Sequence, residues 1–182
     1  MKNQFVDRFF ETMKGQISSS SIKEKLVALA VGAVVFLLVV PTALAVAASA
    51  LTSWIPIPWP GLLEMTVAFL GFWGGLFILG WAILTRFLVG RSDAAPLAPY
   101  SRLITTGPYQ WTRSPMELGL LLYYLGIVTY AANVAAGVLA CLAATGAILW
   151  YQRNYEENEM EQRFGEEYRR YCSQTPSLFP KV

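Results

Sequence analysis

The sequence contains no histidine, and this absence removes the commonest protein ligand of transition metals and the commonest general base of enzymes. Its two cysteines, Cys141 and Cys172, lack CxxC spacing and lie in segments of opposite polarity, so neither a disulfide framework nor a thiolate metal site is expected. Charged residues make up only 14% of the chain, and the formal net charge of +2 is too small to suggest nucleic acid binding. We therefore expect no metal and no nucleic acid partner.

Apolar residues are abundant instead: 55% of the 182 residues are hydrophobic, 14% are aromatic, and the mean hydropathy is positive. This composition is typical of one small integral membrane domain. Apolar runs cover residues 26–51, 63–84 and 118–151, and the last run is long enough for two short spans that meet at residues 131–133. The sequence therefore predicts an all-α integral membrane protein with about four transmembrane helices, the last two forming a helical hairpin.

Residues 1–25 carry aromatic side chains at helical spacing among charged ones, which predicts an N-terminal amphipathic helix at the membrane interface. A secretory signal is the competing interpretation, because the following stretch ALAVAASA contains small-residue cleavage patterns. The charged region is too long and the apolar run too extended for that interpretation. We expect three parts: the amphipathic segment 1–25, two transmembrane helices in 26–89, and a core in 90–182 with a cofactor loop, the hairpin and a C-terminal amphipathic helix.

Two features of the predicted spans bear on packing and orientation. Gly71, Gly74, Gly75 and Gly80 in the second span predict close helix contact.

Lysine and arginine precede the first span, lie between the second and third, and follow the fourth, whereas the two remaining loops have none. The positive-inside rule therefore predicts that both termini and the central loop lie in the cytoplasm.

A polar segment, LITTGPYQWTRSPMELG (residues 103–119), lies between two long apolar runs. Within it, Ser114 and Glu117 have the spacing of a capping box with Pro115 at the first helical position, so the Ser114 side chain is expected to accept from the Glu117 amide. A helix cap does not explain Arg113 beside it, or the aromatic residues around this one basic group. Aromatic belts at the membrane interface account for part of that density, and a binding site at Arg113 accounts for the rest.

The chain after the last apolar run has the pattern of an amphipathic helix, with large apolar side chains at every third or fourth position. Projecting this stripe backwards places Glu156 and Glu157 on the same face. Carboxylates pressed against membrane and core are costly without a partner, so we expect a functional role and Arg113 as their counter-charge. A solvated helix face is the plainer alternative. The stripe consists of Met160, Phe164, Tyr168 and Tyr171.

Two sequence segments carry a resemblance to a known family. TTGPYQWTRSPMELG, followed by the predicted hairpin and then EENEMEQRFGEEYRRYCSQTPSLFP, resembles the C-terminal core of the isoprenylcysteine carboxyl methyltransferase family and its bacterial relatives, which are themselves similar to phospholipid methyltransferases. The resemblance covers about residues 90–180. The first motif is matched by Gly107, Pro108, Tyr109, Arg113, Pro115, Met116 and Gly119, and the second by Glu156, Glu157, Phe164, Gly165, Tyr168, Tyr171, Pro176 and Pro180.

The chain departs from the family pattern at two positions. Ser114 stands where the family commonly has histidine or asparagine, and Glu117 stands where it commonly has tyrosine. If these side chains touch the cofactor, cofactor affinity or substrate choice will differ from the family norm.

The resemblance implies S-adenosyl-L-methionine bound at the cytoplasmic mouth of the hairpin and a lipophilic acceptor, which is a carboxylate, a thiol or a lipid head group. The implied partners are membrane lipids and a lipophilic or lipidated substrate, and the implied location is the inner membrane of a bacterium. Arg113, Glu156 and Glu157 are the expected catalytic residues. The expected cofactor-binding residues are Gly107, Pro108, Tyr109, Arg113, Ser114, Pro115, Met116, Glu117, Gly119, Tyr155 and Glu156.

Two other functional classes stay open at this point. The C-terminal membrane domain of sterol reductases has a similar order of motifs, which would imply an NADPH-dependent enzyme. The changes at Ser114 and Glu117 are also compatible with a retired site in a non-catalytic membrane scaffold or lipid-binding protein.

Overall fold

The structure is a computed structural model that describes residues 27, 30–53, 61–90 and 103–179. The predicted N-terminal amphipathic helix and most of the two long loops, 54–60 and 91–102, lie outside the described residues.

The described residues form helices and no strands, as the sequence predicts. A π-helical turn, η1 (Val35–Val39), leads into α3 (Val40–Thr52), which is followed by the long α4 (Gly61–Gly90) and the short 3-10 helix η2 (Gly107–Gln110). The hairpin is α5 (Pro115–Ala131) and α6 (Val134–Tyr151), and a second π-helical segment, η3 (Gln152–Glu156), joins α6 to α7 (Glu157–Gln174).

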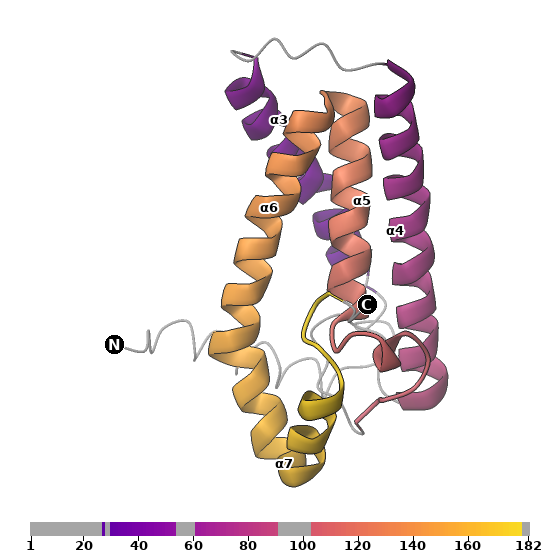
Figure 1. Cartoon of the computed structure of the whole chain (residues 1–182), viewed down its shortest axis with the longest axis vertical. Helices are drawn as coiled ribbons and strands as arrows, with labels where there is room; N and C mark the ends of the chain where they lie inside the picture. The colour runs from indigo at the N-terminus through magenta and orange to yellow at the C-terminus, as the bar shows by residue number, and fades with distance from the viewer. Residues whose placement is uncertain (1–26, 28–29, 54–60, 91–102, 180–182) are drawn as a thin grey trace.

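Four apolar helices lie side by side, with α5 in contact with α3, α4 and α6 (Figure 1). The helix ending in α3 (Ala30–Thr52), the helix Gly61–Val89 and the apolar part of the helix that begins at Val134 are long enough to cross a membrane. The 17 residues of α5 fall at the lower end of the usual range for a span. The prediction of an all-α membrane protein with a C-terminal hairpin is therefore confirmed.

The hairpin turns at the residues that the sequence indicated. Asn133 begins α6 as its N-cap, where its side-chain oxygen accepts from the amide of Ala136 at 2.8 Å. The amide nitrogen of the same side chain donates to the hydroxyl of Thr52 at 3.3 Å, which links the end of α3 to the turn.

Close contact between α4 and α5 depends on glycine. A Cβ at Gly71 would lie 2.8 Å from the Cα of Gly126 in α5, and a Cβ at Gly75 would lie closer still to the backbone of Tyr123 in α5. Gly74 and Gly80 have no atom within 4 Å of such a Cβ. The predicted role in close helix contact is therefore confirmed for Gly71 and Gly75. Among the described residues, Gly74 and Gly80 make no close contact with another helix, so the prediction is wrong for these two.

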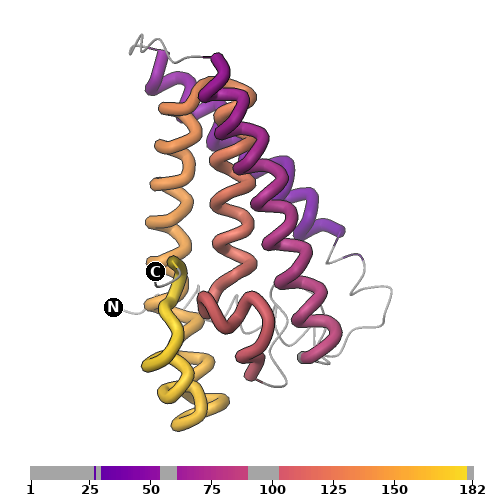
Figure 2. Tube along the Cα trace, turned by 45° about the vertical axis from the view of Figure 1, so that its right-hand side comes forward, coloured from indigo at the N-terminus to yellow at the C-terminus, as the bar shows by residue number. Residues whose placement is uncertain are grey.

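Helix α7 lies at one end of the bundle, beyond the end of α6 and beside the start of α5 (Figure 2). It is sharply kinked at Gly165, whose φ of 50° and ψ of −122° are not helical. The predicted apolar stripe is confirmed, because it forms one small core with Leu103. The residues of that core are Leu103, Met160, Phe164, Tyr168, Tyr171 and Cys172.

Candidate functional site

A recess opens where the start of α5, the π-helical segment η3 and helix α7 meet. The space between its walls, including the open mouth, is about 430 Å³. The walls are Leu103, Ile104, Tyr109, Arg113, Ser114, Gln152, Glu156, Glu157, Met160, Tyr168, Tyr171 and Ser177.

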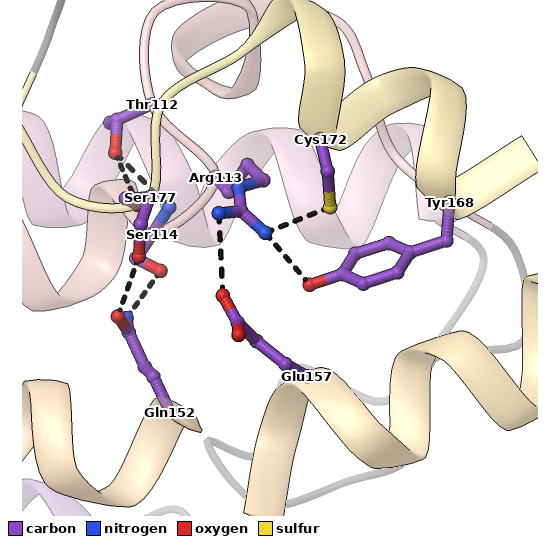
Figure 3. A network of polar contacts seen from close by, with 8 residues as sticks. All are labelled: Thr112, Arg113, Ser114, Gln152, Glu157, Tyr168, Cys172 and Ser177. Carbon is purple, nitrogen blue, oxygen red and sulfur yellow. Dashed lines mark hydrogen bonds and ion pairs between the residues drawn. The ribbon is translucent and has the colours of Figure 1, made fainter. Parts of the chain in front are cut away.

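Arg113 is the central cation of this recess (Figure 3). Its Nη2 lies 3.3 Å from a carboxylate oxygen of Glu157, and its Nη1 donates to the phenol of Tyr168 at 3.1 Å and to Sγ of Cys172 at 2.8 Å. The side chain is only 16% exposed. Its Nε is buried and has no hydrogen-bond partner among the described residues. One N–H of the guanidinium therefore makes no hydrogen bond to the described residues.

The loop that carries Arg113 is fixed by the C-terminal strap, which we define as residues 175–179. The amide of Arg113 donates to the carbonyl of Pro176 at 2.9 Å. The hydroxyl of Thr112 lies 2.8 Å from the carbonyl oxygen of Leu178 and 3.0 Å from that of Ser177. Leu178 is itself only 2% exposed and is packed in the core with residues of α5 and α6. The far end of the chain therefore determines the position of the arginine.

The predicted capping box at the start of α5 is wrong, because the expected hydrogen bond from the Glu117 amide to the Ser114 side chain is not formed. Pro115 does occupy the first turn, but the Ser114 hydroxyl makes no capping hydrogen bond. It accepts instead from Nε2 of Gln152 at 2.5 Å, and Oε1 of Gln152 accepts from the hydroxyl of Ser177 at 2.9 Å (Figure 3). The backbone of Ser114, with φ −128° and ψ 59°, also lies outside the extended region that is usual for an N-cap.

The two predicted carboxylates have different environments. Glu157 forms the expected ion pair with Arg113. Glu156 lines the recess just beyond the end of α6, where burial, followed by the negative charge of Glu117, raises the pKa of its carboxyl to about 8. Arg113 and Arg86 oppose this shift by their positive charges. Only Glu157 therefore has Arg113 as its close counter-charge.

Arg86 in α4 is a buried charge, although in the sequence it is only one of the basic residues between the second and third predicted spans. It is 2% exposed, its Nη1 lies 3.8 Å from Sδ of Met116, and it interacts electrostatically with Glu117 and Glu156. The signal for it was present, because an arginine inside an apolar helix is by default a candidate for a functional or pairing role. Arg86 supplies the positive charge behind the wall of the recess that Glu156 forms.

Several wall residues were missed as site residues because their positions depend on tertiary contacts. The sequence predicts an apolar stripe on α7, and two tyrosines of that stripe, Tyr168 and Tyr171, also line the recess. The phenol of Tyr171 donates to the carbonyl of Tyr109 at 2.6 Å and so holds η2 against α7. The wall residues not predicted as site residues are Leu103, Ile104, Gln152, Met160, Tyr168, Tyr171 and Ser177.

The remaining predicted residues support the site from outside. Gly107, with φ 63°, lies against Thr85 of α4, so its positive φ and tight packing both favour glycine. The ring of Tyr155 stacks on that of Tyr151 at 5.7 Å, away from the recess. Of the predicted catalytic and cofactor-binding residues, Tyr109, Arg113, Ser114, Glu156 and Glu157 line the recess, whereas Gly107, Pro108, Pro115, Met116, Glu117, Gly119 and Tyr155 do not.

Comparison with known families finds one match over more than half of the chain. The model of the phospholipid methyltransferase family matches residues 64–167, which run from α4 through the loop of Arg113 and the hairpin into α7. No curated protein and no solved structure matches the chain. The matched region includes Arg113, Ser114, Gln152, Glu156 and Glu157. The chain therefore belongs to the phospholipid methyltransferase family, a family of membrane methyltransferases.

Proposed function

We propose that this protein transfers a methyl group from S-adenosyl-L-methionine to a lipophilic acceptor, and that the amino-acid end of the cofactor binds in the recess around Arg113. The observation that carries the proposal is the juxtaposition of one buried guanidinium with two carboxylates and two phenols at the end of the hairpin. A family of membrane methyltransferases gives the reaction type, and the recess gives the chemistry of binding.

The polar groups of the recess fit a zwitterionic ligand. A guanidinium suits a carboxylate, and the Nε of Arg113 still has a hydrogen to donate. The carboxylate of Glu157 suits an ammonium or sulfonium group, as does that of Glu156 in its ionised form. The ring of Tyr168, which already lies 5.9 Å from the Arg113 guanidinium carbon, offers an aromatic face to cations. S-Adenosyl-L-methionine carries a carboxylate, an ammonium and a sulfonium.

The bound cofactor supplies a methyl group that is already activated by the sulfonium. The protein therefore needs mainly to orient the two reactants and to exclude water. Leu103, Met160 and Tyr171 provide apolar wall surface for that exclusion. A carboxylate or thiolate acceptor needs no base, whereas an amine or hydroxyl does. Glu156 is the wall carboxyl whose pKa is raised to about 8, so its ionised form is a stronger base than an ordinary carboxylate.

The acceptor in this proposal is a lipid head group, a thiol or a carboxylate on a lipophilic molecule. The recess lies where α5 begins and α6 ends, and the surface of α6 carries exposed apolar side chains such as Leu142 and Trp150. A lipophilic molecule can therefore approach from the bilayer without leaving an apolar environment. The distribution of lysine and arginine favours the cytoplasmic face for the recess.

Calorimetric titration of the detergent-purified protein with S-adenosylhomocysteine tests the proposal. We expect micromolar binding that is lost in Arg113→Ala. Arg169→Ala is the matched control, because Arg169 is 62% exposed and pairs with Glu161 and Glu166 rather than with the recess. Retained binding in Arg113→Ala would contradict the assignment of the site. If the folded wild type does not bind S-adenosylhomocysteine, the result would favour a site that has lost its catalytic function or one that binds a nicotinamide cofactor.

A further inference from the structure

A chain of hydrogen bonds runs along the inner wall of the recess through three side chains from three separate segments (Figure 3). The hydroxyl of Ser177 in the C-terminal strap donates to Oε1 of Gln152 in η3 at 2.9 Å. Nε2 of Gln152 then donates to the hydroxyl oxygen of Ser114, directly before α5, at 2.5 Å. Gln152 is only 3% exposed and Ser114 only 6%, so these polar groups are buried at considerable cost unless they are satisfied.

The Gln152 amide has one defined orientation in this chain of hydrogen bonds. A glutamine side chain has a carbonyl that only accepts and an NH2 group that only donates. Because Ser177 occupies the carbonyl of Gln152, the NH2 group faces Ser114. The Ser114 oxygen is therefore an acceptor in this contact, and its one hydrogen remains to be donated elsewhere. Among the described residues, no acceptor receives it.

A second hydrogen-bond donor without a partner in the described part of the chain belongs to the preceding residue, Arg113. Nε of Arg113 is buried without a partner among the described residues. Arg113 and Ser114 both line the recess, so these two donors belong to consecutive residues of its wall. Two donors of this kind match the two oxygens of a carboxylate, to which hydrogen bonds are stronger than to neutral groups.

We propose that Gln152 is a positioning residue that, with Ser177 behind it, holds the Ser114 hydroxyl as a donor to the carboxylate of the bound ligand, alongside Nε of Arg113. This inference rests on the proposed function, and the ligand carboxylate is then that of the methionine part of the cofactor. Gln152 touches no ligand in this arrangement. It acts by occupying the acceptor side of Ser114, and a fully satisfied buried network of this kind also rigidifies the wall.

The consequence for the C-terminal strap is specific. Ser177 donates to the carbonyl end of the Gln152 amide and so stabilises the orientation in which the NH2 group faces Ser114. The strap therefore contributes to recognition of the carboxylate as well as to the position of Arg113. Loss of the Ser177 hydroxyl would leave the amide free to turn over and to accept from Ser114, which would draw the Ser114 hydrogen away from the ligand.

The test compares two ligands that differ only in the carboxylate. Decarboxylated S-adenosylmethionine keeps the sulfonium, the amine and the nucleoside. We expect the full-length, detergent-purified protein to bind S-adenosyl-L-methionine more tightly than this analogue. Ser114→Ala and Gln152→Leu should each reduce that preference about tenfold, the scale of one hydrogen bond to a charged group, while affinity for the analogue stays unchanged. The double variant should lose no more than either single one, because both changes remove the same donor.

Two further variants separate positioning from packing. Gln152→Glu keeps the size of the side chain but only accepts, so it should also abolish the contribution of Ser114, whereas a packing role predicts little change in the preference. Gln162→Leu, the same change as Gln152→Leu at an exposed position of α7, should leave both affinities unaltered. The inference is overturned if Gln152→Leu weakens both ligands equally, or if the wild type binds both equally well. A folded wild type that binds neither ligand overturns the proposed function as well.

Discussion

The carboxylate of Glu157 lies 3.3 Å from the guanidinium of Arg113. Tyr168, which belongs to the same helix α7 as Glu157, accepts a hydrogen bond from that guanidinium. A straight helix could not present residues 11 positions apart to one side chain, since they would be about 16 Å apart along its axis. The kink at Gly165 lies between them and makes the double contact possible.

Gly165→Ala is expected to weaken this arrangement. At φ 50° and ψ −122° a side chain is strained whatever space surrounds it, and the cost should be about 1–2 kcal/mol of stability. We expect a lower melting temperature and weaker binding of S-adenosylhomocysteine, because Tyr168 and Glu157 can then no longer converge on Arg113. Gly146→Ala in α6 is the control, since a Cβ there meets no atom within 4 Å. Equal behaviour of the two variants would show that the kink has no role in holding the site.

The spans, the hairpin and the principal ion pair could be predicted because each depends on short-range information. Runs without charge predicted the spans, and two local motifs predicted that Arg113 and Glu157 lie together. The stripe of α7 was also predicted, but its period continues through Gly165 and gave no sign of the kink. Periodicity reports which face is apolar, and it does not report where the backbone leaves helical geometry.

The contacts of Ser114 and Arg86 could not be predicted in the same way. The spacing of Ser114 and Glu117 fits a local cap, yet the serine hydroxyl accepts a hydrogen bond from Gln152, 38 positions away. A local hydrogen bond competes with any tertiary partner that the fold brings near, and the sequence shows only the local option. In the sequence, Arg86 is explained by the positive-inside rule. Its burial and its interaction with Glu156 become visible only in the folded structure.

Substitution of the contact glycines of α4 should separate two helices. A Cβ at Gly71 would lie 2.8 Å from the backbone of α5, so Gly71→Ala forces the helices apart at a cost of about 1–3 kcal/mol. Gly74→Ala and Gly80→Ala lie on the same helix without such contacts and should leave the melting temperature unchanged or slightly raised. The measurement is thermal unfolding in detergent. A Gly71→Ala protein as stable as these two controls would contradict the close packing of α4 on α5.

Stability should depend on pH through Glu156. Its pKa is raised from 4.5 to about 8 in the folded protein, so the folded state holds this proton over a pH range in which the unfolded state has released it. The free energy of unfolding that Glu156 contributes is therefore fully present below pH 4.5 and is lost as pH rises through about 8. We expect Glu156→Gln to flatten the decline of melting temperature across this window in the ligand-free protein. Glu161→Gln, which changes an exposed carboxylate of α7, should keep the wild-type decline.

The last prediction concerns the cation behind the recess. Arg86→Met removes the buried positive charge that faces Glu117 and Glu156, and a buried charge left without its partner typically costs about 3–5 kcal/mol. We expect a large fall in melting temperature, which Arg86→Met combined with Glu117→Gln should partly restore because one carboxylate is then neutral. Arg153→Met, at an exposed arginine just after α6, is the control and should have little effect. If the Glu117→Gln change restores nothing, the stability of this region does not depend on charge balance, and Arg86 contributes through the packing of its side chain against Met116.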